Sequence, residues 1–99
     1  MSYHYILHPK AQEDYESSLD WYLRRSQQAA ENFVISIDNT LQLICNNPNR
    51  WRNEYKNYHE LGVKKYPYII VYTIEEDQEL IFVSAIHHAK KHPKKKFRK

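Results

Sequence analysis

Residues 64–93 read KKYPYIIVYTIEEDQELIFVSAIHHAKKHP, and this stretch decides the fold. Residues 66–75 are apolar and β-branched almost throughout, which is typical of a strand in the middle of a sheet. Pro67 is expected at the beginning of that strand, because proline cannot donate a hydrogen bond within a ladder. The polar residues 76–78 predict a turn, and residues 79–87 predict a final apolar strand. The stretch therefore indicates a β-hairpin near the carboxyl end.

The segments before this hairpin predict one more adjacent strand and an irregular connection. Residues 58–63 form a weaker strand pattern, and Lys64 and Lys65 mark the turn that leads into the hairpin. Residues 48–57 are polar and are expected to be irregular, with Trp51 as an anchor. The three closing strands, joined by short turns, indicate an antiparallel meander.

Two helices are predicted upstream. Ser26 can cap a helix that ends at the Asn46-Asn47-Pro48 sequence, and its apolar positions recur at helical spacing: Ala30, Phe33, Ile37, Leu41 and Ile44. A shorter helix spans residues 9–25 and begins at Pro9, after a short strand at residues 3–7. The order β-α-α-β-β-β predicts an α+β fold, in which a twisted antiparallel sheet is covered by a helical hairpin.

Length and composition are those of one small globular domain. The chain has 99 residues, of which 41% are hydrophobic and 27% charged, and residues 1–93 are expected to form the single domain. The single cysteine, Cys45, cannot form an intramolecular disulfide and is expected to be buried and inert. We find no signal-peptide pattern and no run long enough to span a membrane, so a cytoplasmic protein is expected.

Positive charge is concentrated at the carboxyl end. The chain has a formal net charge of +3, yet residues 90–99 contain no acidic residue and these basic ones: Lys90, Lys91, Lys94, Lys95, Lys96, Arg98 and Lys99. Residues 94–99 are therefore predicted to be a basic tail. Such blocks commonly serve as interaction arms for phosphate or an acidic protein surface.

The residues that follow the last strand could support catalysis. Cleavage of RNA without a metal ion needs a base, an acid and cations, and His87, His88 and Lys91 are the candidate catalytic residues if the chain is a nuclease. The same residue types also occur on solvated tails, and electrostatic docking is the favoured interpretation of this segment.

A basic patch for nucleic acid or another target is also predicted. Pairing of the last two strands would bring the Lys64 turn close to His87 and the residues after it, and the patch would consist of Lys64, Lys65, Tyr66, Lys90, Lys91, His92, Lys94 and Lys95. The alternative is that Lys64 and Lys65 form a plain exposed turn. No cofactor or metal site is expected, because Gly62 is the single glycine and no cysteine or carboxylate accompanies His88 and His92.

The order of elements, together with three segments, resembles the RelE/ParE superfamily of bacterial type II toxins. These segments are ILHPKAQEDYESSLDWYLRRS, LICNNPNRW and KKYPYIIVYTIEEDQELIFVSAIHHAKKHP, so that the resemblance covers residues 3–93. It implies a toxin that inhibits growth and stabilises plasmids, and that a cognate antitoxin neutralises. It also implies that toxin and antitoxin can form a hetero-oligomer.

The resemblance implies one of two targets. RelE-like members cut messenger RNA on the ribosome and usually carry an arginine in the third strand and another after the last strand. Here Ile69 and Ala89 stand at those places, although His87, Lys90 and Lys91 could substitute. The closing pattern, with Pro93 after the basic residues, looks more like ParE-like members, which bind DNA gyrase, and slightly favours that target. A non-toxic nucleic-acid-binding module is a further alternative.

Overall fold

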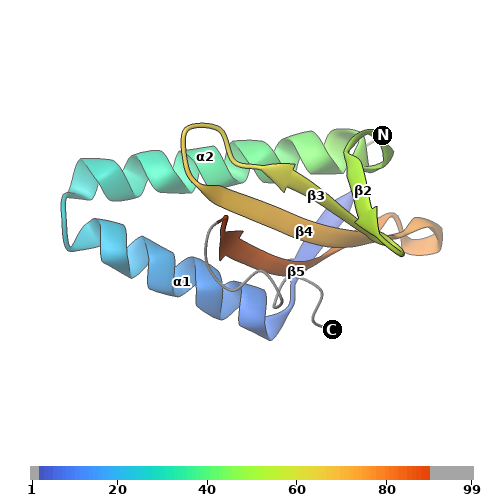
Figure 1. Ribbon diagram of the computed structural model, residues 1–99, viewed down its shortest axis with the longest axis horizontal. Helices are drawn as coiled ribbons and strands as arrows, with labels where there is room; N and C mark the ends of the chain where they lie inside the picture. Colours follow the sequence, from blue (N-terminus) through green and yellow to red (C-terminus); the bar gives the residue numbers. More distant parts are fainter. Residues whose placement is uncertain (1–2, 90–99) are drawn as a thin grey trace.

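The computed structural model describes residues 3–89, which form two helices and a five-stranded sheet (Figure 1). The order of elements confirms the predicted α+β class. The elements are β1 (His4–Leu7), α1 (Pro9–Leu23), α2 (Gln27–Asn46), the 3₁₀ turn η1 (Pro48–Arg50), β2 (Arg52–Tyr55), β3 (Tyr58–Gly62), β4 (Tyr68–Glu75), the 3₁₀ turn η2 (Glu76–Gln78) and β5 (Leu80–His88).

The helices begin where the sequence predicts. Pro9 occupies the first turn of α1, and the Nδ1 atom of His8 accepts a hydrogen bond from the backbone N–H of Lys10 at 2.9 Å. The hydroxyl of Ser26 accepts from the N–H of Ala29, also at 2.9 Å, and caps α2. These contacts satisfy amide groups that a helix start leaves without an intrahelical partner. Figure 1 shows α1 and α2 as a hairpin joined by a tight connection.

The sheet has the order β1-β5-β4-β3-β2, and two features differ from the prediction. The segment 48–57 is not irregular, because it contains β2, which pairs antiparallel with β3 across a turn where Lys56 has a φ of 51°. The short and polar sequence of β2 hides it from a hydrophobic-pattern analysis, as is common for an edge strand. The meander of β3, β4 and β5 is antiparallel as predicted, and β2 extends it. The strand β1 joins β5 in parallel, which differs from the predicted antiparallel sheet.

The main core lies between the helices and one face of the sheet. Side chains alternate between the two faces of a strand, so that Ile70 and Tyr72 of β4 meet Phe33, Ile37 and other residues of α2. The hydroxyl of Tyr72 donates to the carbonyl oxygen of Pro48 at 2.7 Å, which fixes η1 against the sheet. Burial raises the pKa of Tyr72 well above its usual value.

The opposite face of the sheet carries a smaller apolar cluster. It consists of the buried Tyr58, Val71 and Ala85, with Ile69 packed against them. The two clusters therefore use alternate residues of β4. In β5 the register shifts opposite Val71 and Tyr72, so that Val83 and Ile86 both belong to the main core.

Cys45 is buried in the main core, as predicted, and burial raises the pKa of its thiol. In the described part of the chain, neither helix has the length and apolar character that a membrane span requires. The predicted basic tail, residues 94–99, lies outside the described residues.

Candidate functional site

The start of β4 and the end of β5 lie side by side, as the sequence predicts. Tyr68 is the register partner of His88, and the backbone N–H of Ala89 donates to the carbonyl oxygen of Pro67 at 2.7 Å. The N–H of Val63 donates to the carbonyl oxygen of Tyr68 at 2.9 Å and closes the turn between β3 and β4. At this end of the strands, the turn between β3 and β4 therefore lies beside the point where the chain leaves β5.

The turn presents two of the predicted binding residues to solvent. Lys64 and Lys65 are exposed, and Lys65 adopts a left-handed φ of 71°. Tyr66 is partly buried and packs edge-on against Tyr22 and Phe33, with ring centroids 5.6 Å apart in both pairs. Tyr66 therefore anchors the turn to the helices. The other predicted binding residues lie outside the described part of the chain: Lys90, Lys91, His92, Lys94 and Lys95.

His87 is buried on the face of the sheet that the helices do not cover. It is 7% exposed, is the cross-strand partner of Ile69, and shares the face of Ala85. Its Nδ1 lies 3.0 Å from the carbonyl oxygen of His88, so that a proton on Nδ1 is donated to that oxygen. Its buried Nε2 has no hydrogen-bond partner among residues 3–89.

His88 points to the opposite face of the sheet, toward the helices. It is partly buried and contacts Tyr68 edge-on, with ring centroids 5.5 Å apart and an interplanar angle of 70°. Consecutive residues of a strand face opposite sides, so His87 and His88 do not converge on one substrate. Lys91 lies outside the described residues, and a catalytic role for these three residues stays a prediction.

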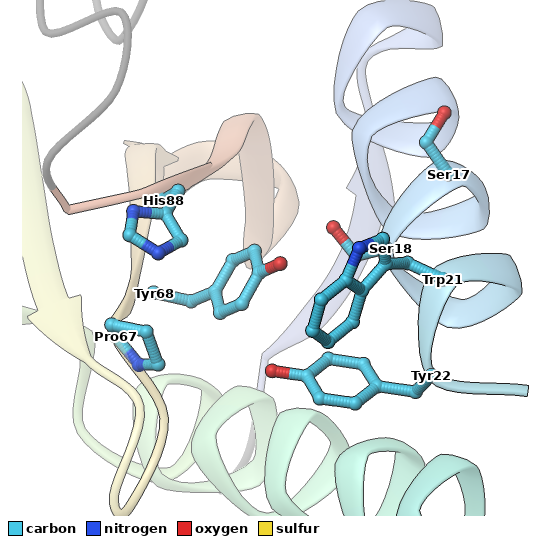
Figure 2. Close-up of a pocket in the computed structure, with 7 residues that line it drawn as sticks. All are labelled: Ser17, Ser18, Trp21, Tyr22, Pro67, Tyr68 and His88. Atoms are coloured by element: carbon cyan, nitrogen blue, oxygen red, sulfur yellow. The ribbon is translucent and has the colours of Figure 1, made fainter. Parts of the chain in front are cut away.

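His88 lines a cavity of about 370 Å³ between α1 and the sheet (Figure 2). Rings from both sides point into it: Trp21 and Tyr22 project from α1 toward Tyr68 on β4. Burial raises the pKa of Tyr22, and a hydrogen bond with Tyr68 adds to this effect. The complete lining is Ser17, Ser18, Trp21, Tyr22, Pro67, Tyr68 and His88.

The sequence analysis did not single out Trp21 as a site residue. Trp21 lies beside the apolar stripe of α1 and is 48% exposed, although tryptophan is costly to leave in water. A large aromatic residue outside the core-facing stripe was the one available signal. The sequence could not show that it stands opposite the end of the hairpin.

A second groove, of about 270 Å³, lies among β1, α1 and α2. Asp38 provides the carboxylate in its lining. Burial raises the pKa of Tyr5 and of Tyr15, and the negative charge of Asp38 adds to this effect. Ile35 is 56% exposed here. The groove is lined by Tyr5, Leu7, Tyr15, Val34, Ile35, Ile37, Asp38, Leu41 and Ile86.

The described residues bring no obvious metal ligands together. Among residues 3–89, no three side chains of His, Cys, Asp or Glu are placed so that they could share one ion. Both cavities are lined mainly by aromatic and aliphatic side chains. Linings of this composition are common in pockets that bind another molecule.

A protein-family comparison matches residues 5–93 to the ParE toxin of the type II toxin–antitoxin system parDE. This chain belongs to the ParE toxin family. The family assignment confirms the RelE/ParE resemblance, and toxins of this family act together with a cognate antitoxin. The curated proteins contain no match to the chain.

Solved structures share the fold at low sequence identity. A chain of the chromosomal ParDE system from P. aeruginosa superposes with a TM-score of 0.74 at 15% identity, covering 90% of this ParE-family chain and 98% of its own. A free E. coli RelE mutant gives a TM-score of 0.63 at 13% identity, covering 91% and 86%. The isolated E. coli RelE toxin gives 0.62 at 12% identity, covering 93% and 89%.

Proposed function

We propose that this ParE-family toxin arrests growth by binding DNA gyrase in the cytoplasm. The observation that carries the proposal is the placement of His87 and His88 on opposite faces of the sheet. An acid and a base must both reach the same phosphodiester in RNA cleavage, whereas inhibition by binding requires no such pair. The match to a parDE toxin over residues 5–93 supports the same target.

The positions where RelE-like nucleases carry arginine give further support. Ile69 packs in the apolar cluster on the face of the sheet that the helices do not cover. The exposed Ala89 carries no charge that could pair with a phosphate. A nuclease stabilises the developing negative charge with cations, which these two residues cannot do. The described part of the chain thus favours a surface for binding over a centre for catalysis.

Messenger RNA cleavage is the second candidate. Its support is the buried imidazole of His87, whose Nε2 has no partner among residues 3–89, together with Lys90 and Lys91 directly after the described part. If this candidate is right, substitution of His87 or Lys91 by alanine abolishes cleavage. If the toxin acts by binding gyrase, neither the unaltered chain nor these two variants cleave messenger RNA.

We also propose that the antitoxin occupies the groove among β1, α1 and α2. The groove is apolar, and the exposed side chains of Tyr5 and Ile35 belong to its lining, as expected where an amphipathic segment lays down its apolar face. Asp38 would pair with a lysine or arginine of that segment. The occupant is therefore an extended or helical segment with aliphatic anchors and one cation.

Inducible expression in a bacterial host tests toxicity and the antitoxin site, and the topology of plasmid DNA in the arrested cells tests the gyrase target. The chain alone should stop growth, and co-expression with the neighbouring gene should restore growth. Ile35→Glu should remain toxic and escape the antitoxin, because it places a charge beside Asp38 in the apolar groove. Leu43→Glu is the matched control, since Leu43 is a 50% exposed aliphatic residue of α2 that does not line the groove.

Two results would contradict these proposals. Normal growth with abundant folded protein would rule out an active toxin and leave a non-toxic binding module. Equal neutralisation of the Ile35→Glu and Leu43→Glu variants would exclude the groove as the antitoxin site, whatever the target of the toxin.

A further inference from the structure

The cavity between α1 and the end of the hairpin has the composition of a stacking site. Trp21 and Tyr22 meet edge-on, with ring centroids 5.0 Å apart and an interplanar angle of 86°, and Tyr68 and His88 form a second edge-on pair on the sheet side. Four aromatic rings thus border a space of about 370 Å³. Flat aromatic walls of this kind bind nucleobases, cations or apolar side chains.

The surrounding charge discriminates among these ligands. The guanidinium of Arg25 lies over the Trp21 ring, 3.6 Å from its centroid. The turn that carries the exposed Lys64 and Lys65 runs directly into Pro67, a wall of the cavity. A cationic ligand would be repelled by these groups, and Arg25 already uses one face of the indole.

The acidic residues of α1 lie outside the lining of the cavity. No carboxylate belongs to its lining. Asp20, one residue before Trp21 on α1, holds the Arg24 guanidinium with an Nε–Oδ2 distance of 2.8 Å. An anionic ligand with a flat ring is therefore the best complement, since its ring can stack while its phosphates meet Arg25, Lys64 or Lys65.

We propose that the cavity lined by Trp21, Tyr68 and His88 binds an unpaired base of single-stranded nucleic acid. Ser17 and Ser18 lie at the helix side of the cavity, and their hydroxyls can hydrogen-bond to a base edge or a sugar. The proposal does not depend on the target of the toxin. Duplex DNA fits poorly, because its bases are stacked and paired and cannot enter the cavity.

Fluorescence titration of the full chain with a labelled oligothymidylate tests the proposal. Trp21→Ala should weaken binding about 10- to 100-fold, as expected for the loss of one base–aromatic stack, whereas Trp21→Phe should retain most of the affinity. Leu23→Ala is the matched control, because Leu23 is a 52% exposed residue of the same helix that does not line the cavity. It should bind as the unaltered chain does.

Two further titrations separate stacking from charge. Inorganic polyphosphate carries the charge without bases, so its binding should not change with Trp21→Ala. Binding of a duplex of the same length should likewise not change with Trp21→Ala, because its paired bases cannot enter the cavity, whereas binding of the single strand should weaken. The proposal is wrong if Trp21→Ala and Leu23→Ala bind the oligonucleotide equally, or if Trp21→Ala weakens duplex and single strand alike.

A third result would assign the cavity to a protein ligand. If Trp21→Ala leaves oligonucleotide binding unchanged but abolishes binding of gyrase or of the antitoxin, a protein side chain occupies the cavity and the nucleobase proposal fails. Circular dichroism of each variant establishes that the helical hairpin is intact. Trp21→Phe preserves the aromatic wall and keeps the comparison valid if the alanine variant does not fold.

Discussion

Phe33 is a core residue whose ring contacts Tyr22 and Tyr68 in the wall of the cavity between α1 and the end of the hairpin. Truncating its side chain should destabilise the whole domain. Its side chain is 0% exposed and lies among four tyrosine rings, with centroid distances of 5.9 Å to Tyr15, 4.8 Å to Tyr22, 5.6 Å to Tyr66 and 5.4 Å to Tyr68. Phe33→Ala removes the ring and leaves a cavity that these neighbours can fill only in part. We expect a loss of about 3–5 kcal/mol in the free energy of unfolding.

This loss is large for a domain of this size, since small domains are stable by only about 5–15 kcal/mol. Urea denaturation followed by circular dichroism should show a midpoint lower by roughly 2 M or more. Phe33→Leu keeps most of the volume and should cost only about 1–2 kcal/mol, mainly for the lost aromatic pairs. We therefore expect Phe33→Ala to be less stable than Phe33→Leu.

The control for this experiment is Ile35→Ala on the same helix, where the side chain is 56% exposed. It should change the free energy of unfolding by at most about 0.5 kcal/mol. A loss below about 1 kcal/mol for Phe33→Ala would refute the reasoning, because it would mean that the tyrosine cluster does not depend on the central ring.

Three further predictions concern buried or capping groups. Tyr72→Phe should cost about 1–3 kcal/mol, because the carbonyl of Pro48 loses its donor. The raised pKa of Tyr72 in the folded state gives stability that is complete below pH about 10 and is lost as pH rises above it, so this variant should flatten the alkaline part of a pH–stability curve; an unchanged slope would contradict the assignment. Ser26→Ala should lower the free energy of unfolding by about 1 kcal/mol through loss of the α2 cap, measured by urea denaturation, and a change below about 0.3 kcal/mol would speak against the cap. Cys45 should react with a thiol reagent only on unfolding, since the thiol is buried and its pKa is raised, and rapid reaction in the native state would disprove its burial.

The sequence predicts the helices and the hairpin because their patterns are long and regular. The stripe through Phe33 and Ile44 repeats over several turns, and the run from Tyr68 to Ile74 is apolar enough to define a central strand. Pro9 in the first turn of α1 and the Ser26 cap of α2 are local signals, so they too can be identified without tertiary information.

Other features depend on contacts between distant segments. The strand β2 has no apolar pattern and exists because β3 offers it a partner. The parallel pairing of β1 with β5 joins segments more than seventy residues apart, and the sequence of β1 alone does not specify its direction. Trp21 becomes a site residue only because α1 packs opposite the end of the hairpin.

The sequence predicts which segments meet at the candidate site, and it does not predict how their side chains are arranged. The sequence indicates that β4 and β5 pair antiparallel, and this pairing brings the turn before β4 close to the end of β5. The separation of His87 and His88 follows from the alternation of side chains along a strand, and the decisive point is that β5 continues through both residues. The sequence predicts a strand end only to within a few residues. A difference of one or two residues determines whether the imidazoles of His87 and His88 lie on the same face.

The central claim, that this ParE-family toxin acts on gyrase, is tested most directly with purified gyrase and plasmid DNA. In the presence of the toxin we expect loss of supercoiling or accumulation of cleaved DNA, and we expect the purified antitoxin to prevent both effects. Unaltered supercoiling by gyrase, together with discrete cuts in translated messages in cells that express the toxin, would contradict the claim and establish messenger RNA cleavage instead.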